Sequence, residues 1–146
     1  MTSSLSVSAG QYSDAGVKPV NQDFHGLLVP KGHQLITKGI AVAIADGISS
    51  SNVSQIASES AVAGFLSDYF STPESWSVKQ SAQRVLLATN AWLHAQTRQS
   101  QYRYDRDRGY VCTLSVMVLR SATAHLFHIG DTRIYRVHHN QLEQLS

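Results

Sequence analysis

The sequence predicts an α+β fold in which two mostly antiparallel β-sheets pack face to face with helices on the outside, an αββα sandwich. Two observations predict this arrangement. Strand-like segments both precede and follow a pair of helical segments, and the second helical segment carries a regular apolar stripe, as expected of a helix packed against another layer. We therefore expect the two helices to pack together on one outer side.

The first part of the chain contains three strand-like segments and one turn. Alternation of apolar and polar residues in "SLSVSAGQYSD" predicts a half-buried strand, and "DFHGLLVP" predicts a second strand that closes at its proline. The glycines of "VPKGHQLITKG" predict a hairpin turn. The run "GIAVAIA" is continuously apolar and rich in β-branched residues, which is typical of a strand buried on both faces.

Two helices are predicted next, over residues 53–70 and 78–98, because apolar residues recur there at helical spacing. The second helix begins with Ser77 and Gln80 at the spacing of a capping box. We interpret Trp92, on the apolar stripe of this helix, as a core residue.

The last part of the chain returns to strand patterns. A polar loop, "RQSQYRYDRDRG", is followed by three strand-like segments, "VCTLSVMVLR", "AHLFHIG" and "TRIYRV". The short connection at Ser121–Thr123 predicts that the first two of them form a hairpin.

Composition argues against several classes of function. The net charge of +2 is too small to indicate binding to nucleic acid or to an anionic membrane. The tyrosines and arginines of "YRYDRDRGY" could stack on bases, but Asp105 and Asp107 cancel two of the three nearby arginine charges, which favours a solvated loop. The longest apolar run, residues 40–45, is far shorter than the about 20 residues of a membrane span. The polar N-terminal residues contain no apolar core of signal-peptide length, so we expect a cytoplasmic protein.

Three aspartates occupy settings that suit a metal ion. Asp23 lies at the start of a predicted strand, Asp46 follows the apolar run and precedes Gly47, and Asp131 lies between two strand-like segments. Hard cations such as Mg²⁺ and Mn²⁺ prefer carboxylate and carbonyl oxygens, and a glycine beside an aspartate lets its carbonyl approach the same ion. The alternative is that Asp46 and Gly47 are a simple turn pair.

Four of these segments, in this order, resemble a known family. "SDAGVKPVNQD", "AIADG", "VCTLSVMVL" and "HIGDTRIYRV" resemble motifs of the metal-dependent serine/threonine protein phosphatases of the protein phosphatase 2C type. The resemblance is strongest to the bacterial forms, including the phosphatase halves of phosphatase–kinase fusion proteins, and runs from about Ser6 to the last residue. It implies that residues 1–146 are the N-terminal part of a single phosphatase-like domain that is incomplete at its C-terminus.

The resemblance also implies roles for individual residues. Asp46 would bridge two Mn²⁺ or Mg²⁺ ions, Gly47 would offer its carbonyl to one of them, and Asp23 would bind metal or metal-bound water. Asp131 would lie near a third, weaker metal position. Lys18 stands where the family usually has an arginine that holds phosphate, but a lysine cannot make arginine's two-pronged contact.

The implied activity is hydrolysis of phosphoserine and phosphothreonine in proteins by a water that the metals bridge. The implied partners are a phosphoprotein substrate and, as in the fusion proteins, a kinase domain in the same protein. Two further metal-binding aspartates come, in the family, from a second half that begins where this chain stops. The alternative is therefore a degenerate or truncated phosphatase-like module that binds a partner without activity. The acid that protonates the leaving group stays open among four histidines: His25, His33, His125 and His128.

Overall fold

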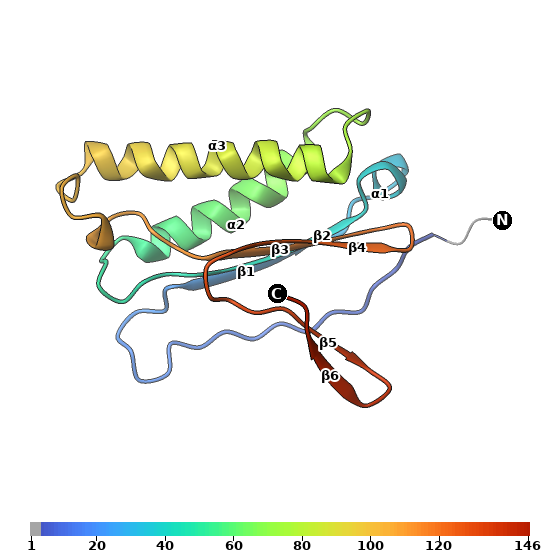
Figure 1. The fold of residues 1–146 in the computed structure, drawn as a ribbon, viewed down its shortest axis with the longest axis horizontal. Helices are drawn as coiled ribbons and strands as arrows, with labels where there is room; N and C mark the ends of the chain where they lie inside the picture. Colours follow the sequence, from blue (N-terminus) through green and yellow to red (C-terminus); the bar gives the residue numbers. More distant parts are fainter. Residues whose placement is uncertain (1–3) are drawn as a thin grey trace.

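The computed structural model describes residues 4–146, which form two antiparallel sheets with helices on one outer face (Figure 1). This confirms the predicted α+β class. The larger sheet has the strand order β1-β2-β3-β4, and the smaller one is the hairpin β5-β6. The strands are β1 (Asp23–Leu28), β2 (Ile40–Asp46), β3 (Leu114–Arg120), β4 (Thr123–Ile129), β5 (Tyr135–His138) and β6 (Gln141–Gln144).

The register of the larger sheet brings chain segments that are far apart in sequence to one end. Asp23, the first residue of β1, lies opposite Asp46, the last residue of β2. Leu114, the first residue of β3, lies opposite Ile129, the last residue of β4. The loops that precede β1 and β3 and follow β2 and β4 therefore meet at the same end of the sheet, on the left in Figure 1.

Two long helices cover one face of this sheet. α2 (Ser54–Phe70) packs on β1 and β2, and α3 (Val78–Gln99) packs mainly on α2. Both agree with the predicted ranges to within one residue. The backbone N–H of Gln80 donates to the Ser77 hydroxyl at 3.0 Å, as the capping-box spacing predicted.

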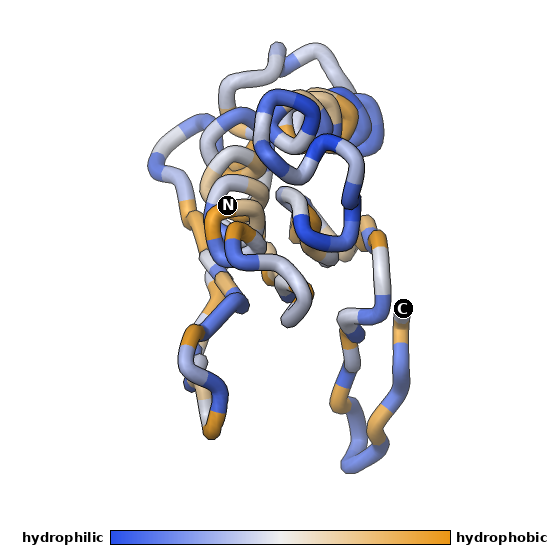
Figure 2. Tube along the Cα trace, turned by 90° about the vertical axis from the view of Figure 1, so that its left-hand side faces the viewer, coloured by the Kyte–Doolittle hydropathy of each residue, from blue (hydrophilic) through white to orange (hydrophobic). Residues whose placement is uncertain are grey.

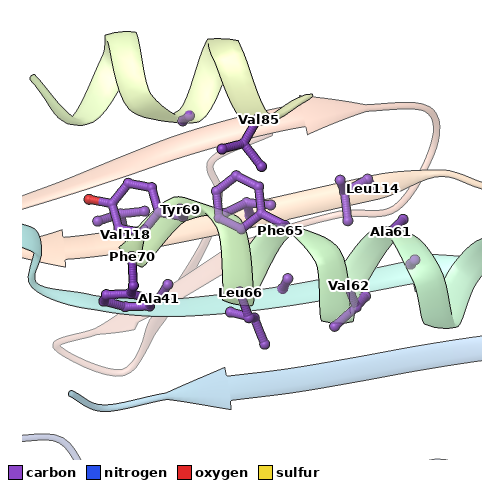
Figure 3. Close-up of a cluster of buried hydrophobic side chains, with 14 of the residues drawn as sticks. Ala41, Ala61, Val62, Phe65, Leu66, Tyr69, Phe70, Val85, Leu114 and Val118 are labelled. Atoms are coloured by element: carbon purple, nitrogen blue, oxygen red, sulfur yellow. The ribbon is translucent and has the colours of Figure 1, made fainter. Parts of the chain in front are cut away.

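The core lies between α2 and the sheet (Figure 3). The rings of Phe65 and Tyr69 on α2 stack at a centroid distance of 5.6 Å. At Gly26 on β1, an added Cβ would come within 2.6 Å of Leu66, so the helix approaches this strand too closely for a side chain. The small side chains of the facing strand allow the same close approach: Ala41, Ala43 and Ala45 are all buried.

The predicted hairpin turn between β1 and β2 is wrong, because the connection contains a short helix, α1 (His33–Lys38). Gly32 and Gly39 flank it with positive φ angles of 67° and 79°. The helix serves to place Lys38, which is only 2% exposed. Its ammonium group donates hydrogen bonds to the Thr72 hydroxyl at 2.6 Å and to the Pro73 carbonyl at 2.9 Å, joining α1 to the connection between α2 and α3.

Three further expectations are wrong. The segment "SLSVSAGQYSD" contains no strand, although residues 9–12 line a pocket together with β1 and β2. β2 is fully buried on one face only, because on the other face Ile40 is buried but Ile44 is 42% exposed. Trp92 is 46% exposed and lines a groove between α2 and α3 instead of filling the core.

The β5-β6 hairpin extends from the molecule on the side of the sheet opposite to the helices (Figures 1 and 2). Its strands join through a tight turn at His139 and Asn140, both with positive φ, which suits a two-residue hairpin loop. Within residues 4–146, no helix has the length and apolarity that crossing a membrane requires.

Candidate metal centre

A pair of aspartates marks the end of the sheet where the loops meet. Asp23 and Asp46 are directly opposite each other on β1 and β2. Side chains of such cross-strand partners project to the same face with their Cβ atoms about 5 Å apart. The two carboxyl groups are therefore close enough for Asp23 to disfavour the ionised form of Asp46 and raise its pKa.

The pair strongly perturbs the ionisation of Asp46. Partial burial and the neighbouring Asp23 carboxyl raise the pKa of Asp46 from 3.8 to about 6. Asp131 raises this pKa further through its negative charge, whereas Lys18 lowers it through its positive charge. The charges of Asp23, Asp131 and Lys18 thus all act on Asp46, and an added cation would relieve the repulsion between the carboxylates.

The backbone of Asp46 is held from the other side by Thr113, a residue that the sequence did not single out. The Asp46 N–H donates to the Thr113 hydroxyl at 3.1 Å, and the Thr113 N–H donates to the Asp46 carbonyl at 2.8 Å. The Thr113 hydroxyl also bonds to that of Thr132. Because Thr132 follows Asp131, this contact ties the loop after β4 to the end of β2.

Gly47, predicted to follow Asp46 in a tight turn, lies where the chain is too closely packed for a side chain. Its N–H donates to the Gln22 carbonyl at 3.0 Å, which continues the β1-β2 pairing by one step. A Cβ added at this position would lie 2.7 Å from the Cβ of Ser54 and 2.9 Å from the carbonyl oxygen of Gln22. Any larger residue would therefore displace the backbone beside Asp46, so the position requires glycine.

Lys18 lies in a loop whose shape is fixed by local hydrogen bonds. Asp14 accepts from the Gly16 N–H at 2.6 Å and from the Tyr12 hydroxyl at 3.0 Å. These two contacts lower the pKa of Asp14. Lys18 and Asp23 both line a polar pocket of about 190 Å³, so the lysine and one of the two aspartates border the same space.

Of the four histidines left open as leaving-group acids, two are near this end of the sheet. His25 lies two residues from Asp23, and His128 bonds through Nδ1 to the Ser115 hydroxyl at 2.8 Å. His33 lies in α1 at the opposite end, where it faces Glu74 at 3.7 Å.

The residues present fit one side of a divalent-cation site. All the candidate donors are oxygens, which suits Mg²⁺ or Mn²⁺, and the raised pKa of Asp46 beside Asp23 indicates that the two carboxylates disfavour each other's negative charge. In the part of the chain that the structure describes, however, no group of three or more His, Cys, Asp or Glu side chains is arranged to hold a metal ion. Asp131 is close enough to act on Asp46 by its charge without completing such a group.

The carboxylate pair on an antiparallel sheet with helices on one face is accompanied by a family match. The family model for protein phosphatase 2C matches residues 11–146. The chain therefore belongs to the protein phosphatase 2C family. No curated protein matches the chain.

Solved structures of bacterial phosphatases share the fold. The serine/threonine phosphatase PstP/Ppp of Mycobacterium tuberculosis has a TM-score of 0.64 and 22% identity, over 89% of this chain and 49% of that chain. Stp1 of Staphylococcus aureus has a TM-score of 0.73 and 17% identity, over 92% of this chain and 51% of that chain. The PstP catalytic domain in complex with two manganese ions matches with a TM-score of 0.63 and 22% identity, covering 89% of this chain and 50% of that one. The chain thus spans about half the length of the structures that it matches.

Proposed function

We propose that this chain contributes half of a metal-dependent active site that hydrolyses phosphoserine and phosphothreonine in proteins. The observation that carries the proposal is the Asp23–Asp46 pair, in which burial and mutual repulsion raise the pKa of Asp46 to about 6. Two carboxylates forced together in this way favour a cation between them. Family membership over residues 11–146 supports the same function.

Each of the candidate site residues has a proposed role in binding metal or phosphate. Asp46 and Asp23, with the Gly47 carbonyl, would hold Mn²⁺ or Mg²⁺, and Asp131 would lie at a further, weaker ion position. When bound, such cations neutralise charge on the transferring phosphoryl group and activate water for attack. Lys18 would hold the phosphate, since it borders the same pocket as Asp23. The Thr113 contacts would keep Asp46 in place during this work.

Residues 1–146 would form the N-terminal part of one phosphatase domain, acting in the cytoplasm in signalling, with a kinase domain in the same protein as a possible partner. The second candidate function is a phosphatase-like module that binds a partner without hydrolysis. It is favoured by one observation, that the described residues arrange no group of three metal-ligating side chains.

Lys18→Arg tests the phosphate role directly. Arginine would restore a two-pronged contact with phosphate, so we expect tighter binding of a phosphothreonine peptide by a few-fold, on the order of 1 kcal/mol, with Mn²⁺ affinity unchanged. Fluorescence anisotropy of a labelled peptide in the presence of Mn²⁺ measures the first, and calorimetry the second. Lys31→Arg, outside the site, is the matched control. Unchanged peptide affinity in Lys18→Arg would show that Lys18 does not contact the phosphate.

A further inference from the structure

A basic segment lies beside the candidate metal centre. Residues 98–108, which we call the arginine loop, comprise the end of α3 and the loop that follows it, and they contain four arginines and two aspartates. The net charge of this segment, +2, equals the formal net charge of the whole chain. The excess positive charge of the protein is therefore confined to this segment. Its four arginines are all exposed: Arg98, Arg103, Arg106 and Arg108.

Hydrogen bonds from two serines hold the arginine loop against the turn that follows β2. The Ser50 hydroxyl donates to the Asp107 carbonyl at 2.7 Å. The Ser51 hydroxyl lies within hydrogen-bonding distance of the Arg108 and Gly109 carbonyls, at 3.0 and 2.6 Å. The backbone of the loop is therefore fixed at the end of the sheet where the carboxylate pair lies, on the left in Figure 1.

Ser51 also connects the arginine loop to the proposed phosphate position at Lys18. Its carbonyl accepts from the Gln22 side-chain amide at 2.6 Å, and Gln22 directly precedes Asp23. Ser51 and Lys18 line the same pocket, of about 320 Å³. Because an extended peptide advances about 3.3 Å per residue, a substrate with its phosphate at Lys18 brings residues a few positions away to the arginine loop.

In the part of the chain that the structure describes, the arginines of this loop have no carboxylate partners. The only two ion pairs there involve α1 and the β5-β6 hairpin. Asp105 and Asp107 alternate with the arginines in sequence but form no ion pair with them. The aspartates therefore lower the net charge of the loop without occupying its guanidinium groups.

Two of the arginines stack on tyrosines of the same loop. The guanidinium carbon of Arg103 lies 5.0 Å from the ring centroid of Tyr104, and that of Arg108 lies 5.9 Å from the ring centroid of Tyr102. Stacking restricts a guanidinium group but leaves its N–H groups free to donate. Less side-chain freedom then remains to be lost when an anion binds, which favours binding.

The arginine loop suits separate carboxylates better than a continuous polyanion. Each guanidinium group can bind one carboxylate through two parallel hydrogen bonds. Asp105 and Asp107, which lie between the arginines, repel the closely spaced phosphates of a nucleic-acid strand. The arginines also cover part of the tyrosine surface on which bases would stack. Glutamate and aspartate side chains of a peptide can instead reach individual arginines.

We propose that the arginine loop binds acidic residues close to the phosphorylated serine or threonine of a substrate, so that the chain prefers acidic phosphopeptide segments. The proposal rests on the proposed function, because that function places the phosphate at Lys18. The arginines act as specificity-determining residues that contact the substrate away from the reacting phosphate.

The test is peptide binding to this chain at low salt, measured by fluorescence anisotropy with Mn²⁺ present. Two labelled phosphothreonine peptides carry either three glutamates or three glutamines on each side of the phosphothreonine. We expect the glutamate peptide to bind about fivefold more tightly, the effect of a few exposed charge pairs. This preference should shrink in about 0.5 M NaCl, because salt screens exposed charges.

Two triple variants show whether the preference comes from the loop. It should disappear when three loop arginines are replaced: Arg103→Gln, Arg106→Gln and Arg108→Gln. Arg106→Gln alone should lower it partly. The matched control removes the same charge from exposed positions before α1 and in the first two turns of α3, and it should keep the preference: Lys31→Gln, Lys79→Gln and Arg84→Gln. An equal loss in both triple variants would indicate a general effect of charge and overturn the proposal, as would a preference that persists in the loop variant.

Unphosphorylated peptides separate failure of this proposal from failure of the proposed function. If the glutamine peptide binds the wild type more tightly with phosphate than without it, but glutamate confers no advantage, the arginine-loop proposal is wrong while the phosphate site stands. If the glutamate peptide binds equally well with and without phosphate, the phosphate site fails, and with it the proposed function and the link proposed here. The same holds if no peptide binds.

A labelled single-stranded oligonucleotide tests the competing class of ligand. Weaker binding than that of the glutamate peptide is expected. If the oligonucleotide binds the wild type more tightly than this peptide does and loses affinity in the loop variant, the loop is a nucleic-acid surface and the proposal is overturned.

Discussion

Asp46 is the residue at which the needs of a metal site and the stability of the free chain conflict. Its folded-state pKa of about 6 lies above the ordinary value of 3.8. The raised pKa means that folding favours the protonated carboxyl over the ionised one. The stabilisation of the fold by protonated Asp46 is therefore full below about pH 4 and is lost as the pH rises through about 6. We therefore expect Asp46→Asn to have a higher melting temperature than the wild type at neutral pH without metal.

Thermal unfolding followed by circular dichroism across this pH range checks the prediction. The advantage of Asp46→Asn should shrink toward acid pH, where the wild-type carboxyl is already neutral, and Mn²⁺ should raise the melting temperature of the wild type only. Asp68→Asn, on the exposed face of α2, is the matched control and should show no such pH dependence. A lower melting temperature for Asp46→Asn at neutral pH would contradict the assigned repulsion.

Thr113 is the second residue on which the site depends. Thr113→Val keeps the shape of the side chain but removes the hydroxyl that accepts from Asp46 and bonds to Thr132. We expect the free energy of unfolding to fall by about 1–2 kcal/mol and the affinity for Mn²⁺ to fall as well. Urea unfolding and calorimetry measure these effects. Thr123→Val, an exposed position on β4, should change neither, and normal Mn²⁺ affinity in Thr113→Val would mean that the hydroxyl does not position Asp46.

At the scale of elements, Lys38 joins α1 to α3 and to the connection that precedes it. Its ammonium group bonds to Thr72, Pro73 and Ser81, and burial lowers the pKa of this group. Lys38→Met fills the space but removes the donor that these three acceptors share. We expect a loss of about 3 kcal/mol in the free energy of unfolding.

Urea unfolding of Lys38→Met beside Lys79→Met, at an exposed position in α3, measures that loss. Mn²⁺ binding should survive in any Lys38→Met protein that remains folded, because α1 lies at the opposite end of the sheet from the carboxylate pair. A stability equal to that of the control would show that the hydrogen bonds of Lys38 contribute no net stabilisation.

At the scale of the whole molecule, local sequence patterns predicted the helices and strands well, but they predicted the contacts between these elements poorly. The helices at 53–70 and 78–98 and the hairpin of β3 and β4 follow from spacing and turn chemistry alone. The strand expected in "SLSVSAGQYSD" does not form, because alternation cannot say whether a partner strand is available. Trp92 was expected in the core, but the helices leave a groove at its position, and helix packing is a tertiary property.

The candidate site shows the same difference between residues that local patterns identify and residues that only tertiary contacts reveal. Asp23, Asp46 and Gly47 could be identified because each follows or precedes a strand in a motif of the family, and the structure places the first two opposite each other. Their action as ligands remains a prediction. Thr113 and Thr132 could not be found in this way, since a threonine beside a strand is common and its role depends on the pairing of β2 with β3.

The most direct test of the account is calorimetric titration of the chain with Mn²⁺, comparing the wild type with Asp46→Ala and Asp131→Ala. Asp46 lies directly opposite Asp23 at the centre of the proposed site, whereas Asp131 acts on it only through its charge. The account predicts that Asp46→Ala removes Mn²⁺ binding and that Asp131→Ala weakens it only partly. Equal losses in the two variants, or unchanged binding in Asp46→Ala, would contradict the claim that the Asp23–Asp46 pair is the metal centre.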